Sequence, residues 1–162
     1  INESILQHLD LVGQSDVQFI WQTGKVYYEA IKERLEGEEL PNLRAVDFIS
    51  DMGAAYKAAD LVISRAGASS ISEFCLIGKP VVLVPSPNVA EDHQTKNAMA
   101  LVNKNAALYV KDSEAADMLL RTAIQAVGDE AKLKALKENI LKLGLKDSAD
   151  IIADEVIKLA TR

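Results

Sequence analysis

Short apolar runs alternate along the chain with longer stretches in which apolar positions recur every three or four residues. The continuous runs at 61–63 and 81–84 are rich in β-branched residues, which is typical of strands buried on both faces. Further strands are predicted at 17–22, 43–48 and 106–110. Helical spacing covers the opening residues and 26–35, 51–59, 69–77, 92–103, 113–127, 130–143 and 148–161. Strands separated by single helices predict an α/β fold, a Rossmann-like parallel sheet flanked by helices and wound with right-handed crossovers.

The carboxyl ends of the strands are where such a sheet binds ligands. We therefore expect a site among the four loops that follow Gln22, Phe48, Ile63 and Val84. No repeat, linker or low-complexity tract interrupts the pattern, so we expect residues 1–162 to form a single domain.

The loop after Ile63 carries the strongest chemical signal. Gly67 and Ala68 are small enough to let a ligand approach the backbone, and Ser69 and Ser70 are both good N-cap residues. A helix that begins at these serines would direct unpaired N–H groups and its positive dipole end at an anion. The segment therefore predicts a diphosphate site that needs no metal ion.

Two charged residues beside this loop each allow two interpretations. Glu73 could close a capping box with Ser70, or it could accept hydrogen bonds from two adjacent ribose hydroxyls, since carboxylate oxygens are pure acceptors. Arg65 is either a surface charge at the end of the strand, which the residues alone favour, or a phosphate contact.

The loops after the second and fourth strands carry residues suited to a nucleotide sugar. The ring of Phe48 and the backbone of Ile49 could stack on and bond a uracil, although Phe48 is more simply a core residue under the next helix. The imidazole of His93 and the amide of Gln94 open a helix and could hold sugar hydroxyls. The alternatives are an ordinary N-cap at Asp92 and a surface position for His93.

Composition and charge narrow the classes of function. The chain has 162 residues, of which 49% are hydrophobic, a net charge of −6 and a pI near 5.0, which argues against binding of nucleic acid. No apolar run approaches the roughly 20 residues of a membrane span, and no signal peptide opens the chain. The single cysteine, Cys75, is expected to be a core residue of a cytosolic protein. A G-x-G-x-x-G fingerprint, a Walker A loop and paired metal ligands are absent from the sequence, so we expect no cofactor and no metal.

Four segments together resemble the C-terminal half of the MurG family of glycosyltransferases, which have the two-domain GT-B fold. They are FISDMGAAY at 48–56, SRAGASSISE at 64–73, GKP at 78–80 and DHQTKNA at 92–98. The resemblance runs in order over nearly the whole chain. It implies the transfer of N-acetylglucosamine from its UDP donor to lipid I, which forms lipid II in peptidoglycan synthesis, by an inverting and metal-independent hexosyltransferase.

The resemblance also implies a binding site for UDP-N-acetylglucosamine. Its substrate-binding residues would be Phe48, Ile49, Arg65, Gly67, Ala68, Ser69, Glu73, His93 and Gln94. Phe48 and the Ile49 backbone would contact uracil, residues 67–69 would face the diphosphate, and Glu73 would bind the ribose. Gln94, with His93 beside it, would contact the N-acetylglucosamine ring, although some relatives carry a glutamine in place of His93.

The chain begins at Ile1 inside a helical pattern, with neither a start methionine nor a cap, so we expect a fragment. By the resemblance, the missing N-terminal domain would hold lipid I, the membrane-contact surface and the general base, at the cytoplasmic face of the membrane. No catalytic residue is then expected within these residues, and the fragment alone would be inactive. Two alternatives are a non-catalytic donor-binding subunit that pairs with a separate acceptor subunit, and a UDP-sugar epimerase of the same fold.

Overall fold

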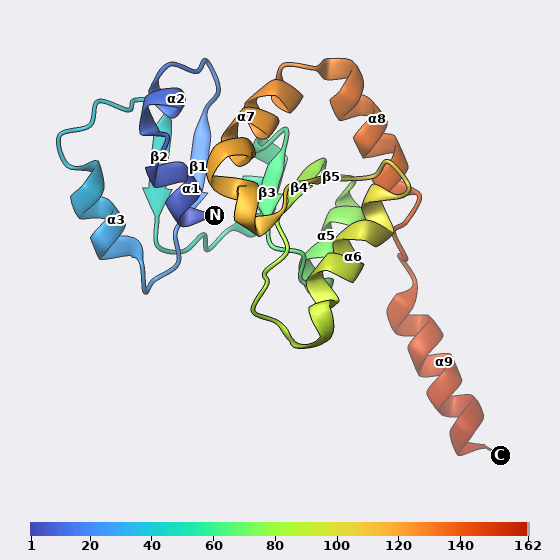
Figure 1. The fold of residues 1–162 in the computed structure, drawn as a ribbon. Helices are drawn as coiled ribbons and strands as arrows, with labels where there is room; N and C mark the ends of the chain where they lie inside the picture. Colours follow the sequence, from blue (N-terminus) through green and yellow to red (C-terminus); the bar gives the residue numbers. More distant parts are fainter. Residues whose placement is uncertain (162) are drawn as a thin grey trace.

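The computed structural model describes residues 1–161 and has the predicted alternation of helices and strands (Figure 1). The strands are β1 (Phe19–Gln22), β2 (Leu43–Val46), β3 (Val62–Ser64), β4 (Val81–Leu83) and β5 (Leu108–Tyr109). The α-helices are α1 (Asn2–Leu6), α2 (Leu9–Gly13), α3 (Tyr28–Leu35), α4 (Met52–Ala58), α5 (Ala68–Ile77), α6 (His93–Val102), α7 (Ala115–Val127), α8 (Glu130–Leu141) and α9 (Ser148–Ala160). Two 3-10 turns, η1 (Ala90–Asp92) and η2 (Asp112–Glu114), precede α6 and α7.

All strand pairs are parallel, as predicted, but the strands form two hydrogen-bonded groups instead of one sheet. β1 pairs with β2, and β4 lies between β3 and β5. Within the described residues no strand pairing links β1 to β3. Apolar side chains join the two groups: Ile1 packs against the core cluster of each.

The strand at β4 shows why its apolar run is continuous. Val81 and Leu83 lie in a cluster with residues of α5, α6 and α8, whereas Val82 and Val84 lie in a cluster with residues of α7. Successive strand residues point to opposite faces, so a strand covered by helices on both sides needs an apolar residue at every position. All four of these side chains are 0% exposed.

Cys75 of α5 is buried in the first of these clusters, as predicted for a core residue. Burial raises the pKa of its thiol, because the thiolate would be poorly solvated there.

Some helix ends lie where residue preferences place them, and others do not. Asp51 caps α4 by accepting a hydrogen bond from the Ala54 amide at 2.8 Å, and Gly78 ends α5 with a φ of 66°. The predicted start of α5 at the two serines is wrong, because the helix begins at Ala68 with Gly67 at the N-cap position. The opening helix is also divided, into α1 and α2.

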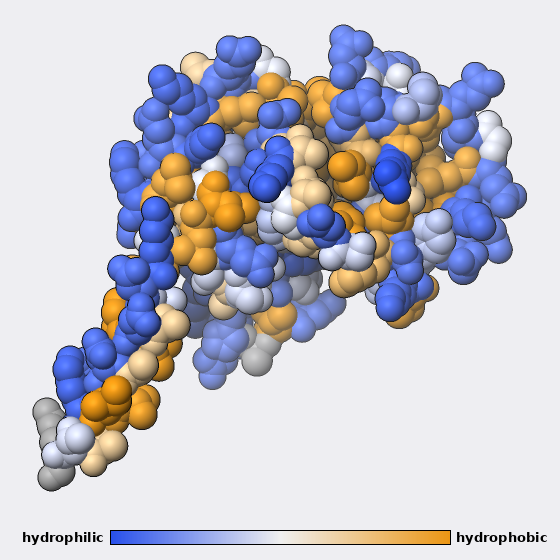
Figure 2. All heavy atoms as spheres, turned by 180° about the vertical axis from the view of Figure 1, so that it is seen from behind, coloured by the Kyte–Doolittle hydropathy of each residue, from blue (hydrophilic) through white to orange (hydrophobic). Residues whose placement is uncertain are grey.

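Helix α9 projects away from the rest of the chain (Figure 1). Figure 2 shows apolar side chains gathered along one side of it, and five large ones are exposed: Ile151, Ile152, Val156, Ile157 and Leu159. Among residues 1–161, no helix has both the length and the apolar character that a membrane crossing requires.

Candidate functional site

The loops at the carboxyl ends of the strands are bonded to one another in two places. The Ile49 amide after β2 donates to Gln22 Oε1 at the end of β1, at 2.8 Å. Gln94 Oε1 accepts from the Ala66 amide at 3.2 Å and from the Ser86 amide at 2.9 Å, which joins the loops after β3 and β4 to α6. These side chains therefore fix the positions of the loops relative to one another.

The N-terminus of α5 presents free backbone donors. The first helical bond runs from the Ile71 amide to the Gly67 carbonyl at 3.0 Å, so the amides of residues 67–70 have no acceptor in the helix. No side chain caps this end, and Ala68 and Ser69 are exposed. An uncapped and solvent-facing helix start can bind an anion through these amides and through the helix dipole.

Gly67 occupies a position where the fold itself does not need glycine. Its φ of −68° and ψ of 143° are ordinary for any residue. A Cβ built there would have Ser70 Oγ as its nearest neighbour, at 3.9 Å, which is ordinary contact. The missing side chain therefore leaves open space at the start of α5.

Ala66, just before this turn, is held through both of its backbone polar groups. Its amide donates to Gln94 and its carbonyl accepts from Asn97 Nδ2 at 3.1 Å, and the residue is 0% exposed. Gln94 and Asn97 lie three residues apart and so share one face of α6. The turn that leads into α5 is therefore positioned by α6.

Arg65 is a partly exposed charge at the end of β3, but it is not free of partners. Its Nη1 donates to the carbonyls of Val84 at 3.1 Å and Pro85 at 3.2 Å, and it pairs with the carboxylate of Asp112. The side chain is 39% exposed and ties the end of β3 to the end of β4 and to η2. Because a guanidinium has five N–H donors, other donors of Arg65 remain for an anion.

Glu73 does not take the capping role that its spacing from Ser70 allows. A capping box with Ser70 does not form, because Ser70 is already in the first turn of α5. Instead Glu73 Oε2 accepts a hydrogen bond from the Tyr56 hydroxyl of α4 at 3.1 Å. Burial, followed by the hydrogen bond and charge of Glu73, raises the pKa of Tyr56 to about 12.

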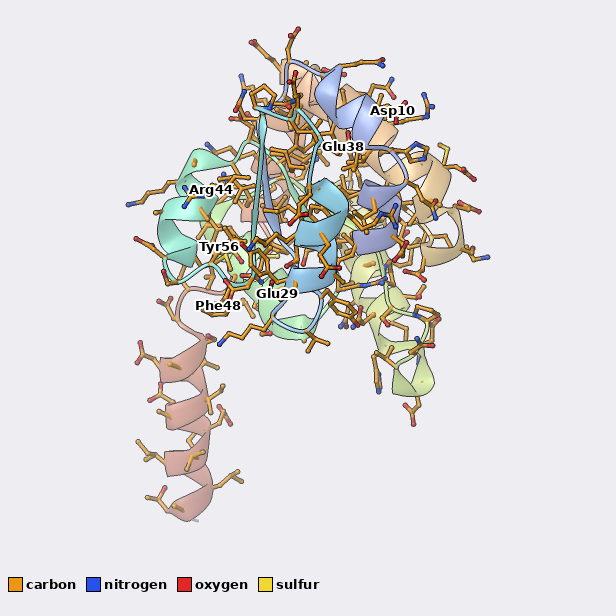
Figure 3. All side chains as sticks on the ribbon, turned by 90° about the vertical axis from the view of Figure 1, so that its left-hand side faces the viewer. Asp10, Glu29, Glu38, Arg44, Phe48 and Tyr56 are labelled. Carbon is orange, nitrogen blue, oxygen red and sulfur yellow. The ribbon has the colours of Figure 1, made fainter. Side chains whose placement is uncertain are left out.

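Phe48 is 59% exposed, so its interpretation as a core residue is wrong. Lys25 Nζ lies 5.7 Å from the centroid of its ring, which is within cation–π range. Figure 3 shows Phe48 just before α4, in the same region of the view as Tyr56 of that helix. An exposed aromatic ring can stack on a planar base.

The start of α6 has no side-chain cap, and His93 is exposed there. Asp92 stands at the N-cap position with a left-handed φ of 55°, but its side chain accepts no capping bond. His93 is exposed and its Nε2 lies 3.9 Å from the Glu91 carboxylate. The structure therefore places His93 at the surface, next to Gln94 in sequence but outside the bonds that Gln94 makes.

Four residues that sequence reasoning missed take part in this arrangement: Gln22, Tyr56, Asn97 and Asp112. Tyr56 lies inside the 48–56 segment, and Asn97 stands one helical turn after Gln94, so spacing along α6 could have suggested it. Asp112 lies 47 residues from Arg65, and no local pattern signals that pairing.

Within residues 1–161, no group of three or more His, Cys, Asp or Glu residues is placed to hold a metal ion.

Comparisons with known proteins agree with the motifs. The model of the glycosyltransferase family 28 C-terminal domain matches residues 1–153. A Bacteroides thetaiotaomicron protein named UDP-N-acetylglucosamine–N-acetylmuramyl-(pentapeptide) pyrophosphoryl-undecaprenol N-acetylglucosamine transferase is 64% identical over 99% of this chain and 44% of its own length. A Bacteroides fragilis protein of the same name is 62% identical over 99% of this chain and 43% of its own.

Among solved structures, the crystal structure of Acinetobacter baumannii MurG matches with a TM-score of 0.78 and 28% identity, over 96% of this chain and 48% of that one. The resemblance inferred from the four sequence segments, and with it the GT-B type of fold, is confirmed. The chain spans less than half the length of each of these relatives.

Proposed function

Because this chain belongs to the family of glycosyltransferase family 28 C-terminal domains, we propose that it is the UDP-N-acetylglucosamine-binding half of a hexosyltransferase. In the complete protein, the sugar would be transferred to lipid I to form lipid II. Residues 1–162 would constitute one donor-binding domain, and an N-terminal domain would bind the acceptor. The named relatives, 62–64% identical to this chain, support this proposal.

The uncapped start of α5 is the single observation that carries the proposal. The free amides of residues 67–70 and the open space over Gly67 match the requirements of a diphosphate. Arg65 stands directly before this turn and would contribute positive charge to the same site. Backbone amides in this arrangement can bind the donor without a metal ion.

The uridine would lie on the neighbouring loop. Phe48 would stack on uracil, and the Ile49 carbonyl would accept its N–H group. The Ile49 amide could bond the base only after Gln22 Oε1 leaves it, since Gln22 now occupies that donor. Glu73 would accept hydrogen bonds from the two ribose hydroxyls, a role suited to an exposed carboxylate.

The sugar would lie near the start of α6. Gln94 uses its carbonyl oxygen for the Ala66 and Ser86 amides, so its Nε2 group would be the part that bonds an N-acetylglucosamine hydroxyl. His93, at the exposed start of the helix, would close over the sugar from outside.

The reaction would be an inverting displacement. The acceptor hydroxyl attacks the anomeric carbon, and the bond from that carbon to the diphosphate oxygen breaks with its electron pair on UDP. The α5 amides would stabilise the negative charge that grows on this leaving group, as preorganised dipoles do. The general base would come from the acceptor domain, so residues 1–162 alone would be inactive. The complete protein would act at the cytoplasmic face of the membrane, as a peripheral protein.

Product analysis with the complete protein tests this function. Incubation with UDP-N-acetylglucosamine and a lipid I analogue should yield the disaccharide lipid and one UDP per transfer, and Glu73→Gln should reduce the rate. Formation of an epimerised UDP-sugar, or release of UDP without transfer, would contradict the proposal. Donor binding without any product would favour a non-catalytic donor-binding subunit.

A further inference from the structure

Beyond the proposed roles of the donor-site residues, we infer that Tyr56 is a positioning residue that orients the carboxylate of Glu73 toward the ribose hydroxyls of the donor. The inference rests on the proposed function, because it takes the ribose as the ligand of Glu73. It is carried by one contact between two helices: the Tyr56 hydroxyl of α4 donates to Glu73 Oε2 of α5 at 3.1 Å.

The tyrosine is well placed to act as a fixed donor. Its ring meets Phe74 edge-on, with the centroids 5.8 Å apart and the planes at 80°. Phe74 is 1% exposed and belongs to the core cluster that contains Val81 and Leu83, against which Tyr56 packs. The position of the hydroxyl is therefore set by the core, whereas the glutamate that it bonds is exposed.

An exposed glutamate without a partner samples several rotamers, and binding a diol would require one of them to be selected. A bond from a core-anchored hydroxyl restricts the carboxylate before the ligand arrives, which lowers the cost of binding. The tyrosine uses only part of the acceptor capacity of Glu73, since a carboxylate has about four lone-pair sites. Two ribose hydroxyls can therefore still bind.

The Tyr56 hydroxyl keeps its proton, and so remains a hydrogen-bond donor, throughout the physiological pH range. The pKa of Tyr56 is raised to about 12 by burial and by the adjacent carboxylate, so the phenol stays protonated at neutral pH. In the described residues around Glu73, no other side chain donates to its carboxylate. Removing the tyrosine hydroxyl should thus free the carboxylate while keeping the ring packed on Phe74.

The test compares ligands that differ at the group Glu73 contacts. UDP and 2′-deoxy-UDP are titrated calorimetrically into the complete protein, as wild type, Tyr56→Phe, Glu73→Gln and the double variant. Tyr56→Phe should lower the preference for UDP over 2′-deoxy-UDP by about 2- to 10-fold, the range expected for one hydrogen bond. The double variant should lose no more than Glu73→Gln does. Tyr109→Phe, a partly buried tyrosine of β5, is the matched control and should change nothing.

A purely structural link between α4 and α5 would not change the ratio of the two affinities. If Tyr56→Phe lowers the melting temperature but keeps that ratio, the inference is overturned. If the ratio changes in Glu73→Gln alone, the role of Tyr56 is overturned while the ribose role of Glu73 stands. If neither variant changes it, or the wild type does not bind UDP, the proposed donor site fails together with the inference.

Discussion

Gly67→Ala separates what the fold needs from what a ligand needs. At φ −68° and ψ 143° an alanine is unstrained, and its Cβ would make only one ordinary contact, with Ser70 Oγ at 3.9 Å. Alanine reduces the entropy of the unfolded chain, which stabilises by about 0.4–1 kcal/mol. It is a poorer N-cap than glycine, which costs about 0.5–1 kcal/mol. These terms nearly cancel, so we expect the free energy of unfolding to change by less than about 0.5 kcal/mol.

The same Gly67→Ala substitution should weaken the binding of UDP strongly. The new methyl group would stand at the N-cap position of α5, where we place the diphosphate. Loss of one hydrogen bond to a charged group costs about 1.5–3 kcal/mol, which corresponds to roughly 10- to 150-fold weaker binding of UDP. Calorimetric titration gives the affinity, and urea unfolding gives the stability.

The matched control is Gly128→Ala, at the end of α7. Gly128 also has ordinary backbone angles and only 3.7 Å contacts for an added Cβ, but it lies away from the loops of the site. It should leave UDP affinity unchanged. Wild-type affinity for UDP in Gly67→Ala would refute the placement of the diphosphate at this turn.

Other positions give separate tests. Phe48→Ala should leave the free energy of unfolding nearly unchanged, because the ring is 59% exposed. It should weaken UDP binding by about 1–3 kcal/mol, because the ring would no longer stack on uracil. Equal affinities of the variant and the wild type in calorimetry would count against stacking. Asn97→Ala should lower the free energy of unfolding in urea by about 1–3 kcal/mol, because it leaves the buried Ala66 carbonyl unpaired, and it should also weaken UDP binding. An unchanged unfolding midpoint would contradict the positioning of the turn before α5 by Asn97. Because the pKa of Tyr56 is raised from the usual value of about 10 to about 12 in the folded protein, the protonated phenol stabilises the fold fully below about pH 10. This contribution is lost as the pH rises to about 12. Wild type should therefore lose about 1 kcal/mol more than Tyr56→Phe between these pH values, after allowance for solvent screening, and parallel pH profiles would refute the contact.

The features that sequence predicts well are those set by neighbouring residues. The run at 81–84 is a buried strand because every position faces a helix layer, and Gly78 ends α5 because glycine accepts a positive φ. The predicted start of α5 differs from the observed one because Gly67, Ser69 and Ser70 are all acceptable N-cap residues, and local preference does not choose among them.

The residues around the site depend on contacts distant in sequence. Phe48 has the apolar character of a core residue, and only the tertiary arrangement leaves it exposed. Tyr56 and Glu73 are 17 residues apart, and Arg65 and Asp112 are 47 apart, so no periodic pattern relates them. The loops themselves could be identified from the order of strands and helices, whereas their cross-links could not.

Ligand-induced stabilisation of the complete protein tests the central claim most directly. A ligand that binds only the folded state at 100 times its Kd stabilises by about 2.7 kcal/mol, which is readily measured as a rise in melting temperature. UDP-N-acetylglucosamine and UDP should both produce such a rise, and ADP and GDP at equal concentration should not. No rise with either uridine nucleotide, or an equal rise with all four nucleotides, would contradict a UDP-sugar site on this domain.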